Sequence, residues 1–314
     1  MSVDLDDEGF DHVVRRHRRE LHVHCYRMLG SFEEAEDAVQ DAVTRAWVAR
    51  ASFVRGDNVR AWLYRIATNV CVDELRRRKR TVQVHSFADV PWLQPYPDHL
   101  LDAPVPRGTQ PEEVAVARDT IELAFVAALQ ELPARQRAAL VLRDVAGWSA
   151  AEAAQALGTS VAAVNSALQR ARATLLQHRP EPDHGRRAGL DDDERALLAR
   201  YVALHENPDP VAMAALVRDD IRVTMPPQPV RLDGWAAIAP LHRMAFGPDG
   251  LGEWRVLPTA VNRLPAAACY LRRREGTHFA PYKLDVLRIV DGLIAEITTF
   301  DEAVFGWLDL PREL

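Results

Sequence analysis

The spacing of apolar residues changes its period along this chain of 314 residues. Up to about residue 178 the apolar side chains recur every three or four positions, as on one face of an α-helix, whereas from Ile221 onward they alternate like those of β-strands. Helices come first, and a mixed segment of helices and strands follows. The pattern predicts a multidomain protein with two all-α helical domains and a C-terminal α+β domain that holds a curved antiparallel sheet.

Two segments break the pattern and predict linkers. The first is rich in proline and cannot form a continuous helix, and the second, at 180–190, is polar and broken. We therefore expect domains at 1–83, 112–179 and 191–314, joined by linkers at 84–111 and 180–190. The first linker also carries five apolar side chains, and we expect another part of the protein to cover them: Trp92, Leu93, Tyr96, Leu100 and Leu101.

The first domain reads as three helices. One should cover residues 10–29 and end at Gly30, and the next should begin at a capping box formed by Ser31 and Glu34. A third should run over about 59–80. Seven of the residues in 60–80 are basic, against Asp73 and Glu74, which suggests a localised contact with phosphates; a solvated helix end is the alternative.

The second domain has the spacing of a helix-turn-helix. A helix over about 134–146 ends at Gly147, a capping box at Ser149 opens a short helix to Leu157, and Gly158 precedes a last helix to about residue 177. This arrangement is typical of a reader of the DNA major groove. An ordinary helical hairpin with a glycine turn is the alternative.

The C-terminal domain should combine helices with a sheet. We expect helices at 192–204, 210–217 and 234–245 and strands at 221–225, 254–261, 267–272, 283–290 and 293–300, with Asp291-Gly292 as a hairpin turn. Such a domain could enclose a pocket for a small-molecule ligand. The polar residues that could converge there are His242, Tyr270, Asp285 and Asp301.

Several classes of protein are disfavoured. No stretch approaches eighteen uninterrupted apolar residues, so no membrane span is expected, and the acidic N-terminus does not resemble a signal peptide. Three widely spaced cysteines fit reduced thiols, so we expect a cytoplasmic protein. His22 and His24 point about 200° apart on a helix, which argues against a metal site there. No cofactor-binding motif is present, and none is expected to bind.

Three segments, in order, resemble one family. The first is Ala-Glu-Asp-Ala-Val-Gln-Asp at 35–41 with Arg-Ala-Trp at 45–47. The second is Ala-Trp-Leu-Tyr-Arg-Ile-Ala-Thr-Asn at 61–69 with Asp-Glu-Leu-Arg-Arg-Arg at 73–78. The third is Leu-Pro-Ala-Arg-Gln-Arg at 132–137 with the helix-turn-helix that ends at Arg172. Together they resemble regions 2 and 4 of an extracytoplasmic-function (ECF) sigma factor of the sigma-70 family. The tail at 290–301 resembles a SnoaL-like domain, which a subset of these sigma factors carries.

The resemblance implies roles for particular residues. Asn165 and Ala167 stand where many family members have basic residues, which implies a different −35 element. The implied contacts with the −10 element are Arg60, Trp62, Arg65, Asn69, Asp73, Arg76, Arg77, Lys79 and Arg80. Those with the −35 element are Ser160, Asn165, Ser166, Gln169, Arg170 and Arg172. Those with core polymerase are Glu36, Asp37, Gln40, Asp41 and Trp47.

The implied partners are core RNA polymerase, through its β′ clamp and β flap, and promoter DNA. In this interpretation the protein is not an enzyme, the apolar linker threads a channel of the polymerase, and the C-terminal domain is a tethered regulator. Two alternatives remain: a helix-turn-helix regulator that works without core polymerase, and a DNA-binding unit fused to a SnoaL-like isomerase or cyclase.

Overall fold

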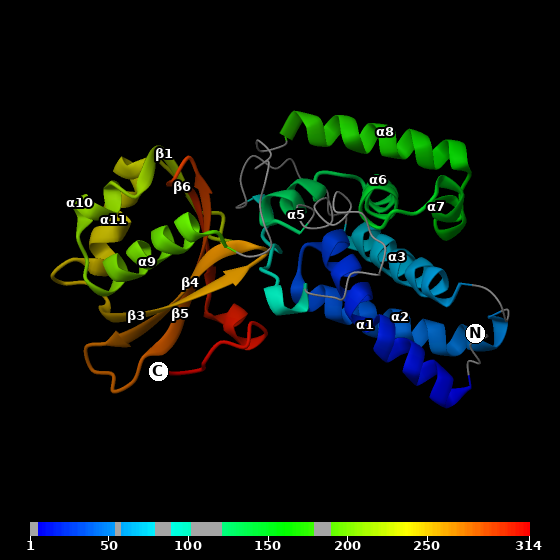
Figure 1. Cartoon of the computed structure of the whole chain (residues 1–314), viewed down its shortest axis with the longest axis horizontal. Helices are drawn as coiled ribbons and strands as arrows, with labels where there is room; N and C mark the ends of the chain where they lie inside the picture. The colour runs from blue at the N-terminus through cyan, green and yellow to red at the C-terminus, as the bar shows by residue number, and fades with distance from the viewer. Residues whose placement is uncertain (1–5, 54–57, 79–88, 102–120, 179–189) are drawn as a thin grey trace. The chain divides into compact units, whose positions relative to one another are not determined.

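The computed structural model describes residues 6–53, 58–78, 89–101, 121–178 and 190–314 (Figure 1). Contacts between these residues divide the chain into two compact units. The N-terminal unit contains the described residues up to 78 and those of 100–178. The C-terminal unit contains 89–99 and 190–314, so it takes in part of the proline-rich linker as well as the tail.

Three helices open the N-terminal unit, each begun or ended by a local cap. Asp6 accepts a hydrogen bond from the Gly9 amide, Gly30 adopts a left-handed conformation with φ of 78°, and Ser31 accepts from the Glu34 amide. These caps satisfy backbone groups that a helix end leaves without partners. The elements are α1 (Asp7–Leu29), α2 (Phe32–Ala49), a short 3₁₀ turn η1 (Arg50–Ser52) and α3 (Val59–Arg78).

The same unit continues with the helix-turn-helix. Ser149 and Glu152 form the expected capping box, and Gly147 and Gly158 take left-handed conformations at the two turns. The expected helix over 134–146 is α-helical only as far as Leu140, because its last turn widens into a π-helix. The elements are α5 (Leu123–Leu129), α6 (Ala134–Leu140), η4 (Val141–Val145), α7 (Ala150–Ala156) and α8 (Val161–His178).

A fully buried arginine joins the two groups of helices. The Arg137 guanidinium donates to the Met28 carbonyl at the end of α1 at 2.5 Å and to the Gln130 side-chain oxygen at 2.6 Å. It also donates to the carbonyls of Gln130 and Leu132. A buried charge is tolerated when several acceptors surround it. Arg137 therefore ties the helix-turn-helix to the first helix within this unit.

The C-terminal unit is a six-stranded sheet with its α-helices on one face (Figure 1). The strand order is β2-β1-β6-β5-β4-β3, and helix α9 packs on β3 and β4 while α11 packs on β1 and β2. The helices are α9 (Asp192–Glu206), α10 (Pro210–Ala214), α11 (Trp235–Phe246) and the 3₁₀ turn η5 (Glu302–Gly306). The strands are β1 (Val217–Thr224), β2 (Arg231–Asp233), β3 (Gly252–Val261), β4 (Leu264–Arg273), β5 (Ala280–Val290) and β6 (Leu293–Asp301).

The expected antiparallel sheet contains one parallel pair. β1 and β6 run parallel, and every other neighbouring pair is antiparallel. The parallel pair arises because α11 carries the chain from β2 to the opposite edge of the sheet, where β3 lies. From there the chain returns through β4 and β5 to β6, which lies beside β1. The Asp291-Gly292 hairpin forms as expected, and Asn262-Arg263 makes a second turn with positive φ at both positions.

The described part of the proline-rich linker is bound to the sheet. The backbone amide of Tyr96 donates to Asn262 Oδ1 at 2.7 Å, and the Asn262 amide donates back to the Tyr96 carbonyl at 3.0 Å. Asp98, which opens the short turn η3 (Asp98–Leu100), accepts from the Arg263 amide. Val90, Leu93 and Tyr96 are buried. Of the five apolar linker side chains that the sequence singles out, Leu93 and Tyr96 are thus buried, whereas Trp92, Leu100 and Leu101 are half-buried.

Candidate functional site

Helix α3 presents one polar stripe to solvent. Asn69, Asp73 and Arg76 follow one another at intervals of four and three residues and are all exposed, and Arg77 lies beside them. The Arg77 side chain is 72% exposed and is held by Glu74 at 2.6 Å. All four residues are thus accessible to a ligand, although Arg77 is paired with Glu74 and Asp73 with Arg45. Lys79 and Arg80 lie outside the described residues.

The other residues expected to meet the −10 element are engaged inside the unit. Trp62 is buried, with its ring centre 5.2 Å from that of Phe53. Arg60 forms an ion pair with Glu20 at 2.7 Å and lies over the ring of Tyr64. Arg65 is half-buried. In this conformation Arg60 ties α3 to α1, and Trp62 packs against Phe53 at the end of η1.

Helix α2 carries an exposed acidic face. Asp37, Gln40 and Asp41 are exposed, and Asp41 holds Arg45 at 2.8 Å. Glu36 is instead bound to Arg18, and Trp47 lies between the ring of Phe10 and the guanidinium of Arg50. The sequence reasoning missed Val48, which is 76% exposed on the same stripe as Asp37 and Asp41. Its apolar type suggested a buried position, and only the helix packing shows otherwise.

Helix α8 separates an apolar face from a polar one. Val164, Ala167, Leu168 and Ala171 are buried, so the position of Ala167 is part of the packing and not of the exposed face. Ser160 caps the helix by accepting from the Ala163 amide. All six residues expected to meet the −35 element are exposed: Ser160, Asn165, Ser166, Gln169, Arg170 and Arg172.

Two arginines on α8 differ in what holds them. Arg170 donates to Ser166 at 2.8 Å, one turn earlier, and both stay exposed. Arg172 makes two hydrogen bonds to the carboxylate of Asp144, at 2.8 and 2.7 Å. Two hydrogen bonds from one guanidinium to one carboxylate hold the guanidinium in a fixed orientation. Arg172 is thus engaged with the preceding π-helix, whereas Arg170 lies on the free face.

The C-terminal unit contains a cavity of about 350 Å³ between its helices and the sheet. Of the four polar residues that the sequence analysis named for a possible pocket, His242, Asp285 and Asp301 line it. Tyr270 does not: neighbouring residues of a strand point to opposite faces, and its hydroxyl donates to the Pro311 carbonyl on the far side of the sheet. The apolar and aromatic lining includes Met213, Trp235, Ile238, Phe246, Leu251 and Trp254.

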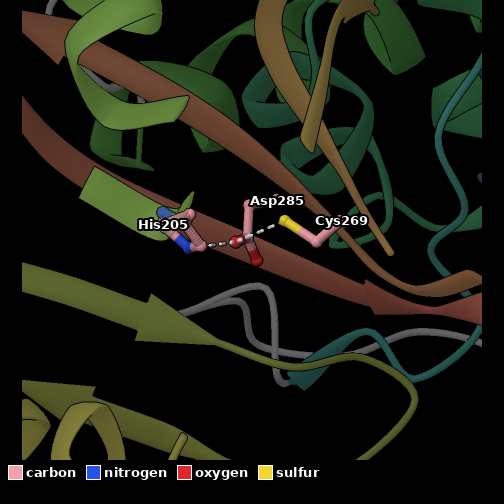
Figure 2. Close-up of side chains that lie close together, drawn as sticks. All are labelled: His205, Cys269 and Asp285. Atoms are coloured by element: carbon pink, nitrogen blue, oxygen red, sulfur yellow. Dashed lines mark hydrogen bonds and ion pairs between the residues drawn. The ribbon is translucent and has the colours of Figure 1, made fainter. Parts of the chain in front are cut away.

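Asp285 is the centre of a buried polar cluster. Its carboxylate accepts from the Lys283 ammonium at 2.6 Å, from the Thr299 hydroxyl at 2.6 Å and from the Tyr201 hydroxyl at 2.9 Å. The Cys269 thiol lies 3.8 Å away, and His205 Nε2 lies 3.6 Å away (Figure 2). Although burial alone would raise it, the pKa of Asp285 stays well below its usual range because Lys283 and these donors favour the charged form.

The sequence reasoning missed the partners of Asp285. Lys283 and Asp285 are two positions apart on β5, so their side chains point to the same face, and this spacing was the available signal. Tyr201 and His205 come from α9, more than seventy-five residues earlier, and no local pattern links them to the strand. The cluster thus depends on the tertiary fold.

His205, Cys269 and Asp285 also lie close enough together to suggest a metal site, with their ligand atoms within 4.8 Å of one another. Two features oppose this interpretation. The Lys283 ammonium already occupies the carboxylate oxygen that a metal would use. Burial and the Asp285 charge raise the pKa of the Cys269 thiol well above its usual value, whereas metal binding requires a thiolate. The cluster fits a hydrogen-bonded ion pair better than a metal centre.

Comparisons with known proteins cover both units. A family model for sigma-70 region 2 matches residues 13–81, and one for sigma-70 region 4 matches residues 122–175. The ECF RNA polymerase sigma factor SigG of Mycobacterium tuberculosis is 38% identical over 313 residues, which is 95% of this chain and 83% of that protein. SigM, an ECF sigma factor of the same organism, is 36% identical over 55% of this chain and 78% of its own length.

Among solved structures, the ECF sigma factor SigJ of Mycobacterium tuberculosis aligns with a TM-score of 0.62 at 20% identity. The alignment covers 98% of this chain and all of that one. The two chains therefore share their fold, including the sheet-and-helix unit after the helix-turn-helix. No helix in the described ranges is long and apolar enough to cross a membrane.

Proposed function

The chain belongs to the ECF sigma factors of the sigma-70 family, and we propose which of its surfaces contact core RNA polymerase and which contact promoter DNA. As an ECF sigma factor the protein binds core RNA polymerase and directs transcription initiation at promoters. This assignment of surfaces rests on one observation: α2, α3 and α8 each bury an apolar face and expose a polar one. The exposed faces are therefore the surfaces available to polymerase and to DNA.

The face of α2 is the proposed contact with the β′ clamp of core polymerase. Asp37 and Asp41 supply negative charge, and the exposed Val48 beside them supplies apolar area. Apolar side chains at the centre of a charged patch are typical of protein interfaces. None of the three is needed for the internal packing of α2, whose buried side is formed by other residues.

Replacing both Asp37 and Asp41 by lysine should weaken binding to core polymerase at least tenfold, because the charge of the contact is reversed. The fold should persist, since both side chains are exposed. A titration of labelled full-length protein with purified core polymerase measures the affinity, and circular dichroism monitors the fold. The control, Asp249→Lys with Glu313→Lys, makes the same change in charge on exposed residues of the C-terminal unit. Equal loss in both double variants would contradict this assignment.

The exposed faces of α3 and α8 are the proposed contacts with promoter DNA. In α3, the exposed Asn69 is the proposed contact with a base of the −10 element, and the exposed Arg76 and Arg77 are the proposed contacts with nearby phosphates. Capture of an unstacked base repays the cost of opening the duplex, so it couples recognition to melting. In α8, the exposed Asn165, Gln169 and Arg170 are the proposed contacts with the −35 element.

Arg170→Ala should lower the preference for a matched −35 element about 5- to 150-fold, as expected for the loss of one base contact. Arg77→Ala should instead lower the affinity for all promoters alike. The salt dependence of this affinity should fall by the amount expected for the loss of about one phosphate contact. Run-off transcription by the holoenzyme on matched and mutated −35 templates, over a series of salt concentrations, separates the two effects. Arg195→Ala, an exposed ion-paired arginine of the C-terminal unit, is the control. An equal loss on both templates would remove Arg170 from the base-reading residues.

The C-terminal SnoaL-like unit is proposed to regulate the sigma factor without catalytic activity of its own. Asp285 is the best placed carboxylate for acid–base chemistry, but it is fully buried and its oxygens already accept from Lys283, Thr299 and Tyr201. A general base needs a free lone pair and a pKa near the working pH. Both features of Asp285 argue against that role.

The proposed regulatory element is the linker segment at 89–99. It joins region 2 to region 4 in the sequence, yet it is hydrogen-bonded to the hairpin turn at Asn262 and Arg263. If this segment must enter a channel of the polymerase, it first has to leave that turn. The C-terminal unit would then oppose binding to core polymerase until the linker is released.

A further inference from the structure

Helix α1 carries a run of basic residues in its middle. Between Asp11 and Glu20 the chain holds four arginines and two histidines and no acidic residue. The helix dipole favours basic side chains only in the last turn, and this run lies more than two turns before the end of α1 at Leu29. The dipole therefore does not account for the run.

Two of the four arginines are engaged inside the N-terminal unit. Arg18 forms an ion pair with Glu36 of α2, and Arg19 donates to the Leu100 carbonyl at 2.6 Å. Both side chains belong to half-buried residues. Arg18 and Arg19 thus stabilise the unit, and a partner could reach them only by breaking these contacts.

The other two arginines, Arg15 and Arg16, are exposed and make no hydrogen bond or ion pair with any described residue. Glu20 lies one turn after Arg16, at a spacing where opposite charges on a helix usually pair. Its carboxylate is bound instead by His17 and Arg60. Two adjacent guanidinium groups therefore keep their donors unused among the described residues. A guanidinium offers five N–H donors in a planar fork, which matches the oxygens of a phosphate.

This part of α1 is joined to the helix that is proposed to meet the −10 element. Arg60, near the start of α3, donates to Glu20 at 2.7 Å. Residues four positions apart on a helix are neighbours, so Arg16 lies beside this contact between α1 and α3. Along α3, Asn69 lies nine residues after Arg60, a rise of about 14 Å, which is the length of about four phosphates along one strand of a duplex. DNA held at Asn69 thus has phosphates within reach of this part of the unit.

We propose that the exposed side of α1, through Arg15 and Arg16, binds backbone phosphates of promoter DNA beside the −10 element. Neither side chain has to leave an internal partner for the contact to form, so the full charge of both is available. Contacts with phosphates fix the position of a protein on DNA without reading its sequence. The inference rests on the proposed contact of α3 with the −10 element and adds to it a second surface that positions the DNA.

The test measures the affinity of the holoenzyme for a promoter that the wild-type holoenzyme selects from a random library. Each phosphate contact contributes about 0.7–0.9 to the slope of log affinity against log salt concentration. Between about 50 and about 200 mM salt, Arg15→Ala with Arg16→Ala should therefore lose about tenfold less affinity than the wild type. Arg15→Lys with Arg16→Lys keeps both charges and should retain most of the salt dependence. The control, Arg200→Ala with Arg312→Ala, removes two exposed arginines of the C-terminal unit and should change nothing.

Methylphosphonates, which neutralise one phosphate at a time, locate the contact. Neutral positions beside the −10 element should weaken binding of the wild type, and the double alanine variant should be insensitive at the same positions. Arg77→Ala reports on α3 separately: full sensitivity at every phosphate in that variant would refute the proposed phosphate contact of α3 and not that of α1. Unchanged salt dependence in the double alanine variant would overturn the proposed surface. Weaker binding of this variant to core polymerase without DNA would also overturn it and assign the arginines to an acidic part of the polymerase.

Discussion

Asp285→Asn should destabilise the C-terminal unit by about 3–5 kcal/mol, because it removes the charge that compensates a buried lysine while keeping the size of the side chain. Lys283 would keep its position two residues away on β5 without a counter-ion. The three cysteines provide a separate readout for each unit: Cys269 is fully buried in the C-terminal unit, and Cys25 and Cys71 are fully buried in the N-terminal unit. Alkylation of each thiol in a urea series, read by mass spectrometry, gives two unfolding midpoints.

Only the Cys269 midpoint should fall in this variant. Asp233→Ala removes a carboxylate that holds two arginines on an exposed strand, and it should cost less than about 1 kcal/mol. The double variant Asp285→Leu with Lys283→Met removes both charges and should recover most of the loss. A Cys269 midpoint that moves equally in Asp285→Asn and Asp233→Ala would show that the buried pair contributes no more than a surface pair.

Asn262→Gly should release the linker and tighten binding to core polymerase. Glycine tolerates the positive φ of 52° at this turn, so the hairpin should survive while the acceptor of the buried Tyr96 amide is lost. An unsatisfied buried amide costs about 1–3 kcal/mol, a factor of about 5–150 in the docking equilibrium. The apparent affinity for core polymerase should rise by up to this factor, because the protein no longer has to release the linker first.

Asp291→Gly is a matched control for this substitution. Asp291 has the same φ of 52° in the other hairpin turn of the sheet, and its side chain is 88% exposed. Titration of labelled full-length variants with core polymerase should therefore show tighter binding for Asn262→Gly alone. Unchanged or weaker binding would mean that docking of the linker does not oppose the polymerase.

Features set by neighbouring residues were predictable from the sequence. The capping box at Ser149 and Glu152, the glycine turns at Gly30 and Gly158 and the hairpin at Asp291-Gly292 all form where the local pattern predicts them. Each depends on hydrogen bonds or backbone angles within four or five residues, so no tertiary information is needed.

Features set by distant residues were not predictable. Tyr270 and Asp285 both looked like pocket residues, but only the pairing of β4 with β5 and the placement of the helices decide which face is covered. The π-helical turn at 141–145 and the exposure of Val48 likewise follow from packing between helices. The sequence predicted that another part of the protein covers the apolar linker side chains, but no local sequence pattern identified Asn262 as the residue that binds the linker.

The contact between the linker and the sheet has a consequence for how the protein is made. Tyr96 and Asn262 lie 166 residues apart. At roughly 5–20 residues per second, a ribosome needs about 10–30 s after Tyr96 to deliver the turn that holds it. Helices α3 and α8, which we propose contact promoter DNA, are both synthesised before that turn exists. Every newly made copy thus passes through a period, before its last strands emerge, in which its linker is not yet restrained.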